Sequence, residues 1–323
     1  MKEKFLELLR CPSCRAPLSM LAVGDVSTGL RCQQCERVTP IKDGIPRFVD
    51  NGSSDVTGST DVAQRTRASF GYELTHFNDW KPSGSENFED YFSEFDLDWL
   101  RGGTVLDGGC GMGRHALQVA PFADRVVALD FSKAIEQAAR NVGDRSNVQC
   151  VQGDLTRLPL ADEAFDFVYS MGVLHHLEDT ALALRRLART LKPGGRLRLY
   201  LYWKRTGVVG ALLSLVGLAR KITTRLPFGL LRVLCWVLSV ILFAAVVVPY
   251  RLLMRLGLRL DGWPLVVYTK YPFNVLYNDQ FDRFSAPLEK RYSEAEVRSL
   301  LEGAGLRDIT IHRRFGWIGD GVK

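Results

Sequence analysis

Cysteine and charged residues are scarce in this sequence, and their scarcity excludes several classes of protein. Only 7 of the 323 residues are cysteine and 24% are charged, whereas 46% are hydrophobic. Seven cysteines are too few for a disulfide-stabilised scaffold, and the composition excludes disordered, collagen-like and coiled-coil proteins. The length corresponds to about two domains. The charged N-terminus reaches Cys11 before any long apolar run, so we expect no signal peptide and a reducing compartment.

Acidic residues are absent between Lys204 and Arg259, where nine lysines and arginines occur. The rest of the chain has 33 basic and 36 acidic residues, so the net charge of +6 comes from this one segment. The segment is also the most apolar part of the chain, because the 18 residues from Val233 to Tyr250 carry no charge. Positive charge among leucines and valines favours an anionic membrane surface, and the lack of interleaved aromatic residues argues against nucleic acid.

Four of the cysteines form two Cys-x-x-Cys pairs, Cys11 with Cys14 and Cys32 with Cys35. Each pair can present two thiolates from a tight knuckle, and two knuckles complete a tetrahedral Zn²⁺ site. The alternative is four free or redox-active cysteines. Four protein ligands leave no position for water, so we expect the zinc to be structural and to stabilise a unit too small for its own hydrophobic core.

From Gly103 onward, short β-branched runs alternate with helical stretches. We expect strands at 104–106, 125–129, 148–151, 165–170, 196–202 and 308–312, and helices at 115–120, 132–141, 180–191 and 293–302. Ser132 is the expected N-cap of the second of these helices. The alternation predicts an α/β fold with right-handed crossovers and a Rossmann-like, doubly wound parallel sheet.

The chain divides into five expected segments. They are a zinc ribbon at 1–50, a linker at 51–64, the cofactor half of the sheet domain at 65–206, a basic apolar helical insertion at 207–260, and the return of the sheet domain with its substrate region and last strands at 261–323. Strands on both sides of the insertion belong to one sheet, so we expect a re-entrant or surface-lying helical unit. Arg251, Arg255 and Arg259 recur every four residues, on one face of such a helix. The alternatives are a lid or a dimer contact.

A glycine-rich turn with Gly109, Gly111 and Gly113 follows the first expected strand of the sheet. Glycines let the backbone approach a ligand closely. Asp130 ends the second strand, 23 residues after Asp107, where a carboxylate can bind the two hydroxyls of a ribose. The turn therefore predicts a nucleotide-containing cofactor at the carboxyl edge of the sheet.

Successive stretches of the chain resemble, in order and with ordinary spacing, the motifs of the class I S-adenosylmethionine-dependent methyltransferases. These stretches are VLDGGCGMGRH, VVALDFS, GDLTRLPLADEAFDFVYSMGVLHHL and LARTLKPGGRLRLYLYW. The resemblance covers residues 100–203 closely and residues 292–323 more loosely. Residues 5–48 resemble the zinc ribbon of small activator proteins of tRNA and protein methyltransferases, which is fused here to the methyltransferase itself.

The resemblance implies S-adenosylmethionine as the cofactor, and it implies a set of contacts. They are Gly109, Gly111 and Gly113 with the methionine part, Asp107 with its amino group, Asp130 with the ribose, Asp154 with the adenine, and Met171 and Gly172 beside the sulfonium. Gly108 stands where many members have a larger residue, and we expect no loss from it.

His175 and His176 follow the fourth strand, where either imidazole could take a proton from the acceptor. The alternative is that one ring packs on the sheet edge and the other caps the next helix. No Asn-Pro-Pro-Tyr or Asp-Pro-Pro-Tyr follows this strand, which argues against amino groups held by that clamp. No cysteine lies there, which argues against methylation of pyrimidine C5.

The sequence thus predicts a cytoplasmic methyltransferase, attached peripherally or monotopically to the inner face of the membrane. Its expected acceptor is a small hydrophobic or lipid-like molecule, namely a lipid-linked sugar, isoprenoid, quinone or lipophilic natural product. The alternatives are an RNA or protein methyltransferase that uses the ribbon for recognition, a non-catalytic scaffold, and an NAD-linked or nucleotide-sugar oxidoreductase, against which the run LKPGG argues. Loss of zinc is expected to leave cofactor binding largely intact.

Overall fold

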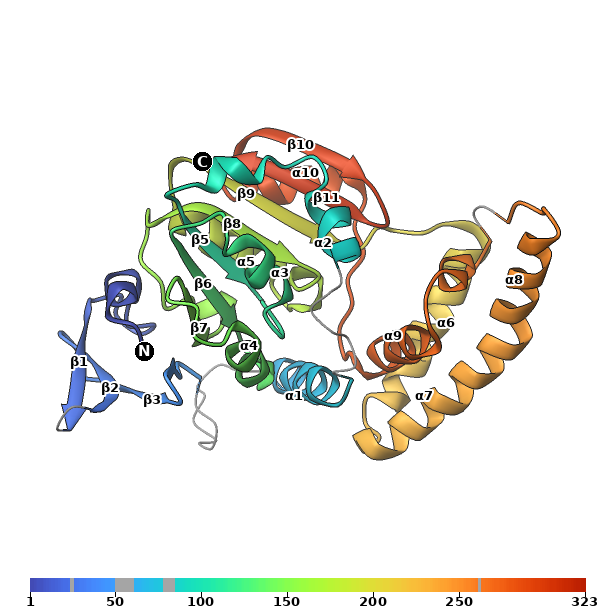
Figure 1. The fold of residues 1–323 in the computed structure, drawn as a ribbon, viewed down its shortest axis with the longest axis horizontal. Coiled ribbons are helices and arrows are strands. Elements are labelled where there is room, and N and C mark those ends of the chain that lie inside the picture. The colour runs from blue at the N-terminus through green and yellow to red at the C-terminus, as the bar shows by residue number, and fades with distance from the viewer. Residues whose placement is uncertain (24–25, 50–60, 78–84, 261–262) are drawn as a thin grey trace. The chain divides into compact units, whose positions relative to one another are not determined.

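The computed structural model describes residues 1–23, 26–49, 61–77, 85–260 and 263–323. The described elements fall into two compact units (Figure 1). The first unit contains the cysteine ribbon and a seven-stranded sheet with its helices, and the second unit is helical.

The ribbon begins with the 3₁₀-helix η1 (Glu3–Leu8) and continues as an antiparallel sheet in the order β1-β2-β3-β4. Its strands are β1 (Leu18–Val23), β2 (Val26–Cys32), β3 (Val38–Lys42) and β4 (Ile45–Pro46). The turns that carry the cysteine pairs each contain a left-handed residue directly after the second cysteine, Arg15 at φ 68° and Glu36 at φ 58°. These turns have the tight bend that a two-thiolate knuckle needs.

The main sheet has the strand order β10-β11-β9-β8-β5-β6-β7. Its strands are β5 (Thr104–Gly108), β6 (Arg125–Asp130), β7 (Val148–Gln152), β8 (Phe165–Met171), β9 (Leu191–Leu201), β10 (Arg307–Arg313) and β11 (Trp317–Val322). Strands β5 to β9 pair in parallel, and β11 is antiparallel to both of its neighbours. The chain runs outward from β5 through β6 to β7 and then crosses to β8. The order therefore reverses between β5 and β8, which is where doubly wound sheets bind ligands.

Eight helical segments accompany this sheet among the described residues. They are α2 (Ser85–Phe92), η2 (Leu97–Leu100), α3 (Arg114–Val119), α4 (Ala134–Val142), η3 (Leu155–Arg157), η4 (Leu174–His176), α5 (Thr180–Thr190) and α10 (Glu294–Gly303). The predicted α/β doubly wound sheet is confirmed. Two local predictions were incomplete: α4 begins two residues after Ser132, although the Ser132 hydroxyl still accepts a hydrogen bond from the Ala134 N–H (3.1 Å), and β11 was not predicted.

The ribbon and the main sheet share one hydrophobic core. Phe5, Leu9 and Leu30 of the ribbon belong to the same buried cluster as Val151 and Leu160 of the sheet domain. Backbone pairing accompanies this packing, because the Arg10 N–H donates to the Pro159 carbonyl (2.9 Å) and the Ala161 N–H to the Leu8 carbonyl (2.8 Å).

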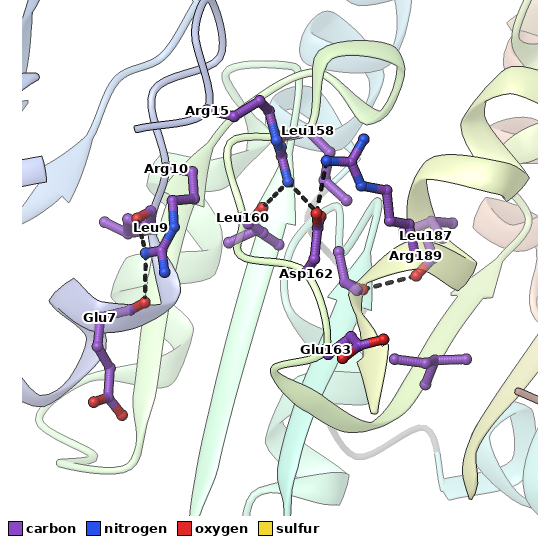
Figure 2. Close-up of polar contacts among 12 residues, drawn as sticks. Glu7, Leu9, Arg10, Arg15, Leu158, Leu160, Asp162, Glu163, Leu187 and Arg189 are labelled. Atoms are coloured by element: carbon purple, nitrogen blue, oxygen red, sulfur yellow. Dashed lines mark hydrogen bonds and ion pairs between the residues drawn. The ribbon is translucent and has the colours of Figure 1, made fainter. Parts of the chain in front are cut away.

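An arginine on the first cysteine knuckle adds polar contacts to this shared core (Figure 2). The Arg15 guanidinium donates to the carbonyls of Leu158 (2.6 Å) and Leu160 (2.7 Å) and pairs with Asp162 (2.6 Å). Arg189 pairs with the other carboxylate oxygen of Asp162 at 2.6 Å. The segment 158–162 is thus held by the ribbon on one side and by the C-terminal turn of α5 on the other.

The second unit consists of helices that pack around α9. Its elements are α1 (Asp61–His76), α6 (Gly207–Thr223), α7 (Phe228–Leu242), the π-helical turn η5 (Phe243–Val247), α8 (Val248–Arg255), η6 (Val266–Thr269) and α9 (Phe273–Ser285). Its small core contains Leu231, Cys235 and Phe281, with Tyr72 of α1 packed against it. The unit therefore includes α1 and α9 in addition to the insertion predicted at 207–260. Residues 51–60 of the predicted linker lie outside the described residues, and its last four residues form the first turn of α1.

The shared core predicts that the ribbon and the sheet unfold together. Leu9 is fully buried, so Leu9→Ala should lower the free energy of unfolding by about 2–5 kcal/mol, the cost of a cavity at a buried leucine. Chemical denaturation followed by far-UV circular dichroism and tryptophan fluorescence measures this change. Val38→Ala is the control, because Val38 lies in the ribbon and is 48% exposed. A separate early transition that leaves the sheet unaffected would contradict the shared core.

Candidate functional site

The glycine-rich turn after β5 adopts a conformation that side chains would block. Gly109, Gly111 and Gly113 have φ values of 89°, 53° and 76°, a region that favours glycine. A Cβ on Gly109 would lie 2.4 Å from a methyl of Val173. The turn is fixed to the end of β6, because the N–H groups of Gly109 and Cys110 both donate to the Leu129 carbonyl (2.8 and 2.9 Å).

Packing also explains why position 108 is a glycine. A Cβ at this position would lie 3.1 Å from the Leu187 side chain, which already fills the space that a larger residue would occupy. The departure from the family pattern at this position is therefore compensated by α5.

Asp107 is a buried carboxylate with an open acceptor atom. The residue is only 2% exposed, and its burial raises the pKa of the carboxyl group to about 8. Within the described part of the chain, Oδ2 of Asp107 makes no hydrogen bond of normal geometry, and the nearby buried Tyr169 hydroxyl lowers the pKa of the carboxyl group by less than burial raises it. A buried acceptor without a partner is costly unless a ligand satisfies it. This atom fits the amino group of an amino-acid moiety such as the methionine part of S-adenosylmethionine.

Asp130 and Asp154 end the next two strand regions along the same edge of the sheet. Oδ1 of Asp130 accepts from the N–H and the hydroxyl of Ser132 (2.7 Å each), and Oδ2 accepts from the Gly111 N–H (2.8 Å). Oδ1 of Asp154 accepts from the N–H and the hydroxyl of Thr156 (2.7 and 2.8 Å). A carboxylate has about four acceptor positions. Each side chain is therefore held in place while acceptor positions on Oδ2 stay available, which suits a ribose and an adenine amino group.

Met171 and Gly172 lie at the end of β8, across the switch point from the glycine turn. Both are partly exposed. Gly172 has a φ of 79°, and a Cβ built on it would meet no atom within 4 Å. The end of β8 therefore has free space next to the glycine turn, as a cofactor sulfonium and an incoming acceptor would require.

His175 and His176 are enclosed by protein. His175 is 0% exposed and its ring stacks on Tyr202, with ring centroids 3.9 Å apart. His176 is 4% exposed, and its Nδ1 lies 2.7 Å from the Leu288 carbonyl oxygen. Such surroundings favour the packing alternative over the predicted role as a base.

Sequence reasoning missed an aromatic cluster at this edge. Tyr91 from α2 lies 5.0 Å from both Tyr200 and Phe315 (ring centroids) and 5.3 Å from His115 of α3. Burial lowers the pKa of His115 to about 3, so the ring is uncharged at neutral pH. The four rings come from distant parts of the chain, and no local pattern connects them. Together they give the edge beside the glycine turn an apolar, aromatic wall.

The four ribbon cysteines converge as their spacing predicted. The Sγ atoms of Cys11, Cys14, Cys32 and Cys35 all lie within 4.8 Å of one another. Sulfurs bound tetrahedrally to zinc at about 2.3 Å are about 3.8 Å apart, so this cluster fits a Zn²⁺ ion closely. The N–H groups of Gln34 and Cys35 donate to Sγ of Cys32 (3.4 Å each), and these bonds lower the pKa of that thiol to about 6. These bonds therefore favour the thiolate form of Cys32, which is the form that binds zinc.

Family models match the two parts of the first unit. Residues 106–199 match the methyltransferase domain, and residues 2–44 match the Trm112p-like protein family. The chain thus contains a methyltransferase domain preceded by a Trm112p-like zinc ribbon, as the sequence resemblance predicted.

Individual proteins match over shorter stretches. The demethylmenaquinone methyltransferase of Corynebacterium kroppenstedtii is 39% identical over 31% of this chain and 42% of its own length. The 27-O-demethylrifamycin SV methyltransferase of Amycolatopsis mediterranei is 38% identical over 30% of this chain and 38% of its own length. The chain therefore spans less than half of these two relatives. A solved complex of the Haloferax volcanii Trm112 methyltransferase activator with a putative methyltransferase covers 77% of this chain and 96% of its own, with 19% identity and a TM-score of 0.45.

The cysteine cluster predicts one zinc ion per chain. Elemental analysis of freshly purified protein should find it, and Cys32→Ser should lose it because three thiolates leave the tetrahedron incomplete. Cys235→Ser is the control, since Cys235 is a buried cysteine of the helical unit and should leave the zinc content unchanged. Wild-type protein without zinc would contradict the assignment.

Proposed function

We propose that this chain, with its methyltransferase domain and Trm112p-like ribbon, transfers a methyl group from S-adenosylmethionine to a hydrophobic or membrane-linked acceptor. The observation that carries the proposal is the series of carboxylates at the ends of adjacent strand regions. Asp107, Asp130 and Asp154 each keep an acceptor position available beside the glycine turn, on Asp130 the second position of an Oδ2 that already accepts from the Gly111 N–H. Such a series matches the amino, ribose and adenine groups of one extended cofactor.

Bound S-adenosylmethionine supplies an electrophilic methyl group on a sulfonium. The residues of this chain then have to bind the cofactor, align the acceptor with its methyl group and exclude water, because methyl transfer is an in-line displacement that depends on orientation. The turn at Gly109–Gly113 and Asp107 hold the methionine end, and Asp130 and Asp154 hold the adenosine end. The space beside Met171 and Gly172 is where an acceptor atom would approach.

The acceptor class follows from the aromatic wall and from the relatives. Tyr91 and Phe315, which pack on the buried Tyr200, offer ring surface but no charge beside the glycine turn. Aromatic surface of this kind suits a quinone, an isoprenoid or a lipophilic natural product. The names of two relatives, a demethylmenaquinone and a demethylrifamycin methyltransferase, agree with this chemistry. The buried His175 and His176 suggest that positioning, more than a strong base, drives the transfer.

The proposal predicts labelled product in the lipid phase. Wild-type protein incubated with S-adenosylmethionine carrying a labelled methyl group and a lipid extract of cells should transfer the label to molecules soluble in organic solvent.

The cofactor assignment predicts that Asp130→Ala weakens the binding of S-adenosylmethionine by about 1.5–3 kcal/mol, the range for hydrogen bonds to a charged group. Gly111→Val should weaken it more, because a branched side chain at φ 53° distorts the turn. Calorimetry measures cofactor binding, and scintillation counting of the organic phase measures the transferred label.

Asp162→Asn is the matched control for this experiment, since Asp162 is a carboxylate of the same domain that binds Arg15 and Arg189. Its cofactor affinity should stay near that of the wild type. Unchanged binding in both Asp130→Ala and Gly111→Val would refute the assignment of the cofactor site.

We also propose that the helical unit binds an anionic membrane surface. The continuous helix over 228–255 has 28 residues and is long and apolar enough to cross a membrane, and only 22% of its apolar window is buried. Large apolar side chains are exposed on this helix and on α6 of the same unit. They include Leu215, Leu218, Ile222, Leu230, Val233, Leu234, Trp236, Val237, Val240, Ile241, Leu252 and Leu253. Lys221, Arg225, Arg255 and Arg259 are exposed among them.

One basic residue of the predicted membrane face has a different role. Arg251 is half-buried and donates to the carbonyls of Thr269 (3.1 Å) and Tyr271 (2.7 Å). The helix ends at Arg255, so Arg259 is not on it. The prediction that Arg251, Arg255 and Arg259 form one interfacial helix face was therefore wrong. The exposed basic residues named above are the ones available to lipid headgroups.

The membrane proposal predicts salt-sensitive binding to vesicles. Each basic residue near an anionic bilayer contributes about 1 kcal/mol, and salt screens this attraction, whereas apolar insertion is not screened. Cosedimentation with phosphatidylglycerol vesicles should therefore weaken, but not vanish, as salt rises. The variant Lys221→Glu/Arg225→Glu/Arg255→Glu should sediment far less than the wild type. Arg145→Glu, which changes one exposed arginine of the sheet domain, is the control; wild-type protein that stays in the supernatant at low salt would contradict the proposal.

A further inference from the structure

We propose that Arg47 of the zinc ribbon is a positioning residue for the cofactor site and acts through Gln152 on the turn Asp130–Ser132. This inference rests on the proposed function, because it assigns Asp130 to the ribose of S-adenosylmethionine. It makes the ribbon part of the cofactor-binding apparatus, whereas from the sequence we expected loss of zinc from the ribbon to leave cofactor binding largely intact.

The first link is a continuation of the sheet. Arg47, directly after β4, pairs in parallel with Gln152 at the end of β7, and the Phe48 N–H donates to the Gln152 carbonyl (2.8 Å). The next residue along, Gly153, donates its N–H to the Asp130 carbonyl (3.0 Å). The ribbon backbone, the end of β7 and the end of β6 therefore form one hydrogen-bonded series that leads to Asp130.

The second link is a relay of buried side chains. Arg47 is 5% exposed, and its Nη1 donates to Oε1 of Gln152 (3.3 Å) and to Oε1 of Glu136 (3.4 Å). Gln152 is 0% exposed, and its Nε2 donates to the carbonyls of Ser132 (3.2 Å) and Phe131 (3.4 Å). A carboxamide has one accepting end and one donating end. Because the guanidinium occupies the accepting end, it fixes the donating end on the turn after β6.

The third link connects this turn to the carboxylate. Oδ1 of Asp130 accepts two hydrogen bonds from Ser132, so the position of Ser132 determines where the carboxylate points. Without Arg47, Oε1 of Gln152 loses its donor, and the amide is no longer anchored in the orientation that donates to the two carbonyls. Weaker support of the turn would then let it move and, with it, the acceptor atoms assigned to the ribose hydroxyls. Arg47 is thus expected to act on affinity for the ribose and not on affinity for the rest of the cofactor.

A second arginine provides the matched control. Arg125 begins β6, at the strand end opposite Asp130, and it also crosses to the ribbon, where it donates to the Lys4 carbonyl (3.2 Å) and pairs with Glu7. Its loss removes a ribbon contact without touching the turn Asp130–Ser132. A ribbon that acted through stability alone would give each arginine variant the same loss of affinity for a cofactor ligand with ribose hydroxyls as for one without them.

The experiment compares two ligands by titration calorimetry, S-adenosylhomocysteine and its 2′,3′-dideoxy analogue, which lacks the ribose hydroxyls. Arg47→Met should bind S-adenosylhomocysteine about tenfold more weakly than the wild type, which is about one hydrogen bond, and should bind the dideoxy analogue with wild-type affinity. Arg125→Met should bind both ligands like the wild type. Gln152→Glu keeps an acceptor for Arg47 but cannot donate to the carbonyls, and it should reproduce the Arg47→Met pattern.

Arg47→Lys keeps the positive charge and tests the guanidinium itself, and it should recover part of the affinity for S-adenosylhomocysteine. Equal losses for the two ligands in Arg47→Met and Gln152→Glu, or the same loss in Arg125→Met, would overturn the positioning role while leaving the proposed function standing. Wild-type protein that binds neither ligand would overturn the proposed function and this inference together.

Discussion

An edge strand of a parallel sheet exposes unpaired backbone groups and an apolar flank, and both have to be covered. In this protein β7 is that edge strand, and the ribbon covers its end through the pairing of Arg47 with Gln152, while Leu9 pairs with Leu160 in the segment that follows β7. The ribbon in turn is too small to keep its shape without the four-cysteine site. The ribbon, the edge strand β7 and the turn Asp130–Ser132 therefore depend on one another for their structure. Zinc contributes by stabilising the ribbon.

The helical unit follows a different constraint. On α7, Leu231, Cys235 and Ser239 are buried at four-residue spacing, which leaves most of the helix circumference apolar and exposed. Each such side chain stabilises the protein by roughly 1.5–3 kcal/mol only when it is removed from water. The chain enters this unit from β9 and returns to β10 of the same sheet, so a single crossing of a bilayer by the helix 228–255 does not fit the topology. A helix that lay in the membrane–water interface would remove its apolar side chains from water and would still let the chain return to the sheet on the same side.

Local sequence patterns predicted the parts of the fold that depend on neighbouring residues. They failed where contacts between residues distant in the sequence determine the structure. The cysteine spacing and the alternation of strand and helix were sufficient for the metal site and for every strand of the main sheet except β11. Strand β11 was missed because Gly319 and Gly321 weaken its strand pattern; a Cβ on Gly319 would lie 3.0 Å from Leu301 of α10, so packing requires the glycine. Arg251 was misplaced because its carbonyl partners come 18 and 20 residues later. The relay from Arg47 spans 105 residues and has no local signal.

The fused ribbon also bears on the scaffold alternative, in which the ribbon recruits a separate partner. Phe5, Leu8 and Leu9 are at most 3% exposed because the sheet of the same chain covers them. Offering this surface to another protein would require these side chains to leave their own core, at a cost of about 2–5 kcal/mol for each fully buried leucine. This part of the ribbon's apolar surface is therefore buried within the chain. Under the proposed assignment of Asp130 and Asp154 to the cofactor, a ribbon that stabilises this sheet edge acts mainly on cofactor binding, and this favours an enzyme with a built-in support over a recruiting module.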